Sequence, residues 1–440
     1  MLRPYGQATC SQCAADLTVP RRVCNLFHLQ PVVLNVESET EDTVMKPQTR
    51  IPALALGLTL ATALGATAAL SAAEQVRSFQ QPFPGTGEVR LANLAGRIEL
   101  VKGTGPGMVV DATIHGDFGS AAETQRQIQA LRWVKGHDKK GREEWELSYP
   151  VDKYRSYSYP TGKQEDSGLP AFLGFLGGLG NTSTTYRGER VKIYHRKGSA
   201  PTLYVDLRIA LPAGANLAIR NSVGKVNGGD LEGTLSIDTG SGDVQLASQS
   251  GQLGVDTGSG DVVVGAVRGE TTISTGSGDV VVRHFVGNGT IDTGSGNVTV
   301  QKVSAGKLTL DTGSGDVTLQ DGEAGRVVAK TGSGGVKVLS VELEDLTAET
   351  GSGDVTVLSS LAHTRRLSAE TGSGDVDIKA GANASFNVVS DQGSGDLNVR
   401  YADAVLRKSG RKVVGAKRGS GQTEIHVETG SGDCTIRPQG

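Results

Sequence analysis

The chain has 440 residues and a formal net charge of −3, so neither sign of charge dominates. This balance argues against a nucleic-acid-binding protein, which needs a concentrated basic face. Glycine is over-represented, at 62 residues, while aromatic residues make up only 4% of the chain. Such an excess of glycine without a collagen Gly-X-Y period indicates either disorder or turns that recur at fixed intervals.

The first 73 residues indicate export. Lys46 and Arg50 precede an uncharged run at 51–70, and small residues at 71–73 lead to Glu74. This order is typical of a secretory signal peptide, and we predict one at 45–73. Residues 1–44 are then a disordered, non-native extension from a start codon placed too far upstream. A transmembrane anchor is the alternative, but a run rich in Ala, Thr and Gly favours the cleaved signal.

Cysteines and a histidine near the start have a spacing that zinc sites use: Cys10, Cys13, Cys24 and His28. Because they lie in the predicted extension, we expect no metal site there. The mature chain keeps only Cys434, so no internal disulfide is expected, and no cysteine is placed to carry a lipid anchor. Cys434 takes the valine position of a repeat and is predicted to be a small buried residue.

Residues 86–220 predict irregular coils at the start of the fold. Val89-x-Leu91-x-Asn93 followed by Gly96-Arg97-Ile98 has the pattern of a strand, a turn and a second strand. Ser120 begins a capping box, which predicts a short helix at about 120–133. A long insertion follows at about 145–194. It holds most of the aromatic residues, and its middle is rich in glycine.

Residues 221–440 repeat the hexapeptide Thr-Gly-Ser-Gly-Asp-Val. Its first glycines, from Gly240 to Gly372, are separated by 18, 18, 18, 19, 19, 19 and 21 residues. A period near 20 with short alternating segments predicts a solenoid in which each repeat is one coil. The glycines predicted to form structural turns are Gly240, Gly242, Gly258, Gly260, Gly276, Gly278, Gly294, Gly296, Gly313, Gly315, Gly351, Gly353, Gly372 and Gly374.

Two strands can be assigned in each coil, one on either side of the turn. Leu253-x-Val255-x-Thr257 precedes a turn and Val244-x-Leu246 follows one, and both alternate with the period of two that a half-buried strand has. Between Thr239 and Val244 the alternation slips by one residue, which we expect glycines with positive φ to absorb. The predicted fold is all-β: a single-stranded parallel β-solenoid of 18–21-residue coils at 86–440, with right-handed winding.

The aspartates of the repeat raise two chemical hypotheses. Asp238-Thr239-Gly240 has the form of an aspartic-protease signature, but its recurrence along a rod does not give two facing aspartates. A row of aspartates, one per coil, suggests calcium. However, each coil has one predicted turn, and Asn297 and Gly335 interrupt the row. We therefore expect each aspartate to accept backbone N–H bonds of its own turn, without a metal.

A basic loop at 400–421 interrupts the period before the last coil. Its cationic residues are Arg407, Lys408, Arg411, Lys412, Lys417 and Arg418. An open solenoid end presents unpaired backbone groups, so we expect this loop to flank the final coil and blunt it with charge.

The chain resembles the bacterial putative-adhesin family of β-strand-repeat domains of unknown function. The resemblance rests on Val205–Gly214, on the serial turns, and on Gly419-Ser420-Gly421 leading to Ile425–Thr429. It covers about Gly87 to Arg437 and implies the repeat fold, with an adhesin-like role as an expectation.

The sequence predicts a periplasmic or secreted, non-catalytic scaffold or adhesin-like binding protein of a cell envelope. We expect no catalytic residues, cofactor or metal, and an envelope protein or glycan as partner. The tyrosines of the insertion are candidates for partner binding, although a mobile loop that covers exposed solenoid surface is the favoured interpretation: Tyr149, Tyr154, Tyr157, Tyr159 and Tyr186. A carbohydrate-active β-helix enzyme is the alternative function, and it would need carboxylates converging in one groove.

Overall fold

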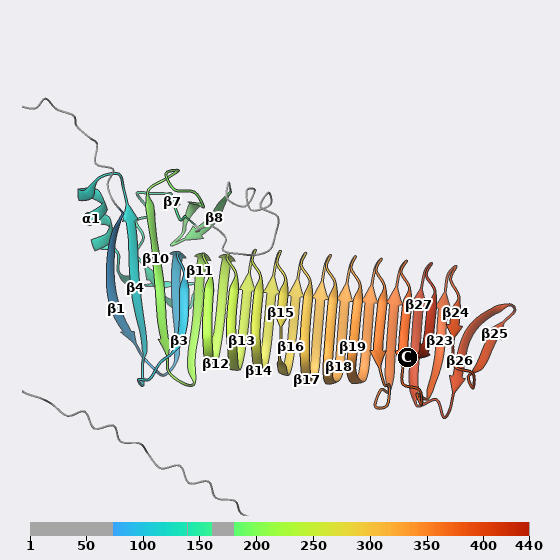
Figure 1. The fold of residues 1–440 in the computed structure, drawn as a ribbon. Helices are drawn as coiled ribbons and strands as arrows, with labels where there is room; N and C mark the ends of the chain where they lie inside the picture. The colour runs from blue at the N-terminus through green and yellow to red at the C-terminus, as the bar shows by residue number, and fades with distance from the viewer. Residues whose placement is uncertain (1–73, 139, 161–179, 440) are drawn as a thin grey trace, which may run out of the picture. The chain divides into compact units, whose positions relative to one another are not determined.

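A computed structural model describes residues 74–138, 140–160 and 180–439 (Figure 1). The predicted extension, the predicted signal peptide and the glycine-rich middle of the predicted insertion lie outside the described residues. Within those residues, no helix is long and apolar enough to cross a membrane.

The described residues of the N-terminal part form one helix and eleven strands. These are β1 (Gln75–Phe83), β2 (Glu88–Ala95), β3 (Ile98–Lys102), β4 (Met108–Asp117), α1 (Ala121–Ala130), β5 (Trp133–His137), β6 (Glu143–Leu147), β7 (Ser156–Ser158), β8 (Asn181–Tyr186), β9 (Glu189–Tyr194), β10 (Thr202–Leu211) and β11 (Ala215–Val223).

The remaining strands form the regular coils and the C-terminal end. They are β12 (Val226–Ser241), β13 (Val244–Thr257), β14 (Val262–Thr275), β15 (Val280–Val282), β16 (Phe285–Thr293), β17 (Val298–Thr312), β18 (Val317–Thr331), β19 (Val336–Thr350), β20 (Val355–Ser359), β21 (Arg366–Thr371), β22 (Val376–Ala380), β23 (Phe386–Gln392), β24 (Leu397–Val399), β25 (Val405–Ser409), β26 (Lys412–Arg418), β27 (Thr423–Thr429) and β28 (Cys434–Pro438).

The predicted parallel β-solenoid is confirmed. Consecutive coils pair in parallel with a shift of one repeat, so Val244 lies beside Val262 and Thr257 beside Thr275. In β14 the buried residues are Val262, Val264, Val267, Thr271, Ile273 and Thr275, which face inward from both sides of the coil. Stacked coils place equivalent residues in rows along the rod (Figure 1). The hand of the winding stays a prediction.

Each coil has a second corner that the sequence pattern did not predict. In several coils, such as β13 and β14, the chain runs through it in one long strand. Glycines at this corner have positive φ: Gly251 at 112°, Gly269 at 131° and Gly287 at 127°. The interpretation of one turn per coil was therefore wrong. The 18-residue spacing of these glycines was the available signal. The extra residue of the 19-residue coils enters just beyond this corner, between Ala305 and Leu308.

The first coil is built from β2 and β3. In register, β2 lies beside β11, and β3 lies beside the start of β12. On the other edge of β3 come β10, then β4, then β1, the last two pairings being antiparallel. The sheet on the opposite side extends from β2 to β6 and β5.

The helix and the insertion differ from the expected boundaries. Ser120 accepts a hydrogen bond from the Glu123 N–H, as a helix cap does, but α1 ends at Ala130, and Trp133 begins β5. Strands β7 to β9 and the end of β6 lie within the predicted insertion. Tyr149, Tyr157 and Tyr186 are buried with ring centroids less than 6 Å apart, so these three aromatic residues form core and not an exposed loop.

The C-terminal end departs from sequence order. Strands β27 and β28 insert between the β21–β22 coil and the β23–β24 coil, pairing with both. The coil that ends the stack is therefore 386–399, and the coil containing Cys434 is internal. The basic segment forms an antiparallel hairpin, β25–β26, whose β26 pairs with β23. It flanks the last coil in space, not the last coil in sequence as expected.

Candidate functional surfaces

The polar groups of the Thr-Gly-Ser-Gly-Asp turn form hydrogen bonds that join neighbouring coils. Thr331 Oγ1 donates to Gly315 O of the preceding coil at 2.7 Å and accepts from the Gly334 N–H of its own turn at 3.1 Å. The same pair of bonds recurs at Thr312 and Thr350. In the second coil Asn221 replaces the threonine, and its amide donates to Gly96 O at 2.9 Å. These groups satisfy buried backbone atoms, which explains why a polar side chain lies on the inner side of the strand.

The glycines of the turn are required because the coils approach closely. An ideal Cβ on Gly276 would lie 2.5 Å from Gly258 O, and one on Gly315 would lie 2.0 Å from Gly296 O. The expected positive φ is found at Gly242 (155°), between Thr239 and Val244, but not at Gly276. Stacking of backbone on backbone, not a left-handed conformation, excludes a side chain there.

Turn aspartates bridge neighbouring coils. Asp261 Oδ1 accepts the Asp279 N–H at 3.0 Å, and Asp375 Oδ1 accepts the Asp433 N–H at 2.8 Å. The acceptor role was anticipated, but the donor belongs to the next coil and not to the aspartate's own turn. Asn297 can replace aspartate in this role, since its side-chain oxygen accepts the Asp316 N–H at 2.9 Å. Among the described residues, no cluster of three or more His, Cys, Asp or Glu is arranged to hold a metal ion.

A groove runs across the outer face of the coils between β18 and β27. Its floor is one row of outward-facing residues in register: Val328, Thr347, Ser368 and His426. One wall is the row that contains Arg326, Asp345, Arg366 and Glu424. This outer groove has a volume of about 800 Å³. Arg326 and Arg366 both contact Asp345, whose pKa is lowered chiefly by the hydrogen bond from Arg366.

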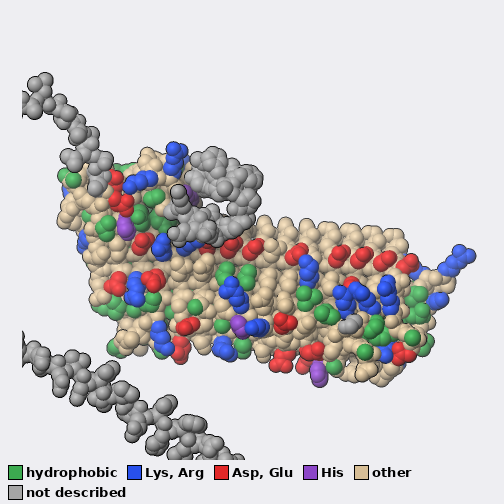
Figure 2. Space-filling model, in the orientation of Figure 1, with side chains coloured by type: hydrophobic (Ala, Val, Ile, Leu, Met, Phe, Trp, Pro, Cys, Tyr) green, Lys and Arg blue, Asp and Glu red, His purple; other side chains and the backbone are tan. Residues whose placement is uncertain are grey.

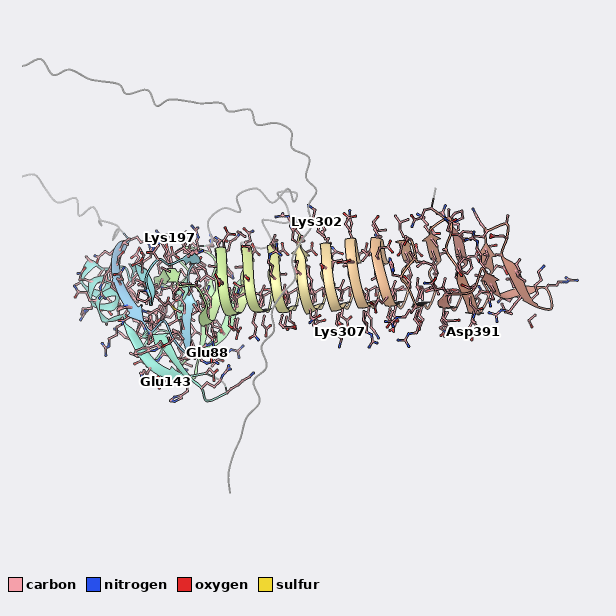
Figure 3. All side chains as sticks on the ribbon, turned by 90° about the horizontal axis from the view of Figure 1, so that it is seen from below. Glu88, Glu143, Lys197, Lys302, Lys307 and Asp391 are labelled. Atoms are coloured by element: carbon pink, nitrogen blue, oxygen red, sulfur yellow. The ribbon has the colours of Figure 1, made fainter. Side chains whose placement is uncertain are left out.

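Two positions beyond the floor residue in each strand lies an acidic row, which we define as Asp292, Asp311, Glu349, Glu370, Glu428 and Asp391, with Lys330 between Asp311 and Glu349. Beside the glycine turns it borders a second groove of about 560 Å³. Figure 2 shows a line of acidic side chains along the coils with basic side chains beyond it. Lys307, which lies beside Arg326 in the adjacent coil, and Asp391 project on the same side of the stack (Figure 3). Burial and the neighbouring Asp292 raise the pKa of Asp311.

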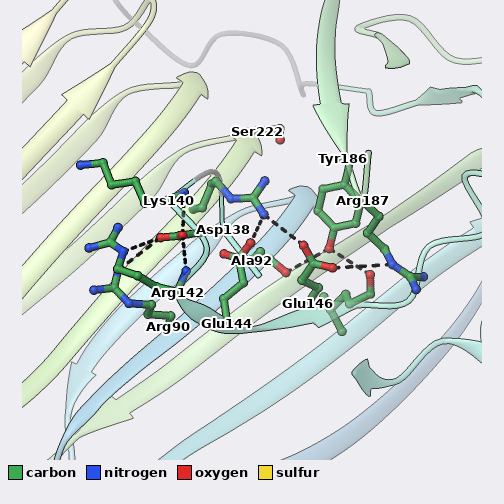
Figure 4. A network of polar contacts seen from close by, with 12 residues as sticks. Arg90, Ala92, Asp138, Lys140, Arg142, Glu144, Glu146, Tyr186, Arg187 and Ser222 are labelled. Atoms are coloured by element: carbon green, nitrogen blue, oxygen red, sulfur yellow. Dashed lines mark hydrogen bonds and ion pairs between the residues drawn. The ribbon is translucent and has the colours of Figure 1, made fainter. Parts of the chain in front are cut away.

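The N-terminal part of the fold contains a buried polar network between β6 and β11 (Figure 4). Glu144 and Glu146 lie on the same face of β6, and Arg220 Nη2 donates to them at 2.5 Å and 3.3 Å. Burial and the adjacent Glu144 raise the pKa of Glu146. Tyr186 Oη donates to Leu147 O at 2.9 Å, covering the cluster. Both carboxylates are buried and paired with Arg220, so the network fastens the insertion to the first coils and offers no open acid for catalysis.

The tyrosines proposed for partner binding do not form one surface. Tyr149, Tyr157 and Tyr186 are fully buried. Tyr154 donates to Glu123 at 2.9 Å, and Tyr159 packs against Tyr204.

The residues of the outer groove were not singled out from the sequence. The available signal was the register itself, since the outward-facing residue three positions before each turn threonine falls on the groove floor.

Comparison with known proteins bears on the regular coils. Residues 269–437 match the family described as Toastrack DUF4097, and we call them the Toastrack segment. The expected resemblance to an adhesin-like family of β-strand repeats is thus confirmed, over a shorter span than Gly87–Arg437. The Toastrack segment contains the outer groove, the acidic row and the C-terminal hairpin. A search of curated proteins gave no match.

Three solved bacterial structures are similar to the chain. A putative cell adhesion protein from Clostridium sporogenes is 8% identical, with 83% of this chain and 100% of that chain covered and a TM-score of 0.17. A putative lipid binding protein from Parabacteroides distasonis is 12% identical, with 82% and 96% covered and a TM-score of 0.32. A putative adhesin from Bacteroides fragilis is 12% identical, with 83% and 98% covered and a TM-score of 0.28. Because these TM-scores are low, the Toastrack match is the comparison that bears on this chain.

Proposed function

We propose that the chain is a non-catalytic, adhesin-like binding scaffold of a bacterial cell envelope, and that its outer groove binds an envelope protein or glycan. The observation that carries the proposal is the continuous groove of about 800 Å³ built from equivalent side chains of consecutive coils. Surfaces of this kind, extended along a rigid repeat, are typical of binding in solenoids. The polar groups of the turns form hydrogen bonds between coils, so they serve the stacking of the coils. This supports the outer groove, and not the turns, as the binding surface.

Filling the groove floor tests this function. Thr347→Arg places a long cation on the floor, whereas Thr318→Arg places the same side chain on the outward face of the opposite side of the coil. Both threonines are half-buried. We expect Thr347→Arg to reduce co-sedimentation with isolated cell envelopes at least about tenfold, a loss of ~1.4 kcal/mol. Equal binding by the two variants would exclude the groove as the binding surface.

Export is a separate part of the proposal. A signal peptide cleaved before Glu74 would place the solenoid outside the cytoplasm, in the periplasm or beyond. N-terminal sequencing of the protein from culture medium and periplasm is expected to begin near Glu74. Recovery of intact Met1 from the cytosol would contradict export.

An enzyme is the second candidate, and the acidic row is the feature that favours it. Asp311, Glu349, Glu370 and Glu428 line one groove, and the raised pKa of Asp311 suits a general acid. Glycan depolymerisation by the wild-type protein, lost in Asp311→Asn, would establish this function in place of the scaffold. We expect no release of reducing ends from cell-wall polysaccharides.

A further inference from the structure

The C-terminal hairpin projects beyond the last coil (Figure 1). All five residues of β25 are exposed, including Val405 at 69% and Leu406 at 42%. Within the described part of the chain, β25 pairs only with β26. The outer edge of β25 therefore has unpaired backbone groups and exposed apolar side chains, which a partner would cover.

The hairpin is also strongly cationic. Residues 400–421 contain seven Lys or Arg side chains and one acidic side chain, Asp403, which pairs with Arg418. Arg407 and Lys412 donate to main-chain oxygens of β23 and the turn after it, so they anchor the hairpin to the end coil. Among the described residues, no carboxylate lies within ion-pair distance of Lys408, Arg411 or Lys417. These three cations remain for a partner.

The acidic row has an excess of negative charge that cations of a partner could neutralise. Its carboxylates lie in consecutive coils, at about 4.8 Å for each coil, and like charges at this spacing repel. Lys330 is the one cation in the row, and it pairs with Glu349 at 2.6 Å. The hairpin of the same molecule is held away from most of the row, because β26 is paired to β23, where Asp391 ends the row.

We propose that the hairpin 400–421 of one copy docks on the acidic row of a second copy, with Lys408, Arg411 and Lys417 facing Glu370 and Glu428. The apolar pair Val405 and Leu406 would then cover the groove floor near Val328, so a second copy and the envelope partner would compete for this part of the outer groove. Such a contact joins two different surfaces, so it does not close on itself and builds chains of molecules. An envelope scaffold gains from this arrangement a way to extend beyond one rod.

Sedimentation velocity tests the contact with the purified chain. At about 100 µM protein and low salt we expect the weight-average mass to be at least twice that of the monomer. Raising the salt to about 0.5 M should return it toward the monomer, because the contact depends on exposed charges. A wild-type protein that stays monomeric at low salt would overturn the proposal.

Charge reversal identifies the two surfaces. Lys408→Glu with Arg411→Glu, or Glu370→Lys with Glu428→Lys, should each abolish association. The variant that carries all four changes should associate again, because the two surfaces are again opposite in charge. Arg268→Glu with Lys302→Glu is the control, since both residues lie near the second corner and outside the contact. Association that survives either pair of reversals, or that the fourfold variant fails to restore, refutes the docking.

Discussion

The second glycine of the turn offers the sharpest test of how the coils are held together. In Gly315→Ala the new methyl would meet Gly296 O at 2.0 Å, Gly296 C at 2.5 Å and Asn297 N at 2.9 Å. All three atoms belong to the backbone of the preceding coil, so no side chain can move aside. The corner of one coil must therefore separate from the other by about an ångström, since a methyl carbon and a carbonyl oxygen need more than 3 Å.

The cost depends on the contacts that this separation breaks. Overpacking in a close-packed interior costs about 1–3 kcal/mol. The hydrogen bonds between these two coils lengthen as well, including that from Thr312 Oγ1 to Gly296 O, and a bond of this kind contributes about 1 kcal/mol. We expect Gly315→Ala to destabilise the protein by about 2–4 kcal/mol in total.

Gly254→Ala is the matched control. Its Cβ would have Ser236 Oγ at 3.8 Å as its nearest neighbour, which is an ordinary contact. Because glycine weakens a strand interior, this substitution should be neutral or stabilising by up to about 1 kcal/mol. Urea unfolding followed by circular dichroism compares the two, with midpoints reported because long repeat arrays need not unfold in two states. Equal midpoints for both variants would refute the close-stacking explanation.

Three further predictions concern the polar groups of the coils. Thr331→Val should lower stability by about 1–3 kcal/mol because it leaves Gly315 O and the Gly334 N–H without partners, while Thr347→Val on the outer face should change it little; urea midpoints compare the two. Arg437 holds the pKa of Asp377 below its ordinary value of 3.8, so the stability from this pair is present above that pH and is lost as pH falls through the lowered pKa. Asp377→Asn should therefore lower the urea midpoint at neutral pH, and its difference from wild type should narrow as the pH falls through that lowered pKa. Millimolar calcium should leave the melting temperature nearly unchanged, and a rise of about ten degrees or more would show that the acidic side chains bind the ion.

The sequence alone determined the repeat and the main features of each coil. The 18- and 19-residue spacing of the turns and the alternation around Val255 and Leu310 identify the coil, the parallel stacking and the inward residues, because these depend on local periodicity. The position of Cys434 in a valine row could be predicted in the same way, and the structure shows its side chain fully buried.

Tertiary structure alone decided which coil lies next to which. Every coil presents nearly the same backbone edge and the same turn, so Gly430 stacks on Gly372 as readily as Gly393 would, and periodicity cannot tell them apart. The hydrogen-bond donor to each turn aspartate could not be predicted for the same reason. The N–H that donates to Asp261 belongs to the next coil and not to its own turn. The outer groove and the acidic row arise only when residues about 19 positions apart are brought side by side, because a binding surface on a solenoid belongs to the stack and not to any single repeat.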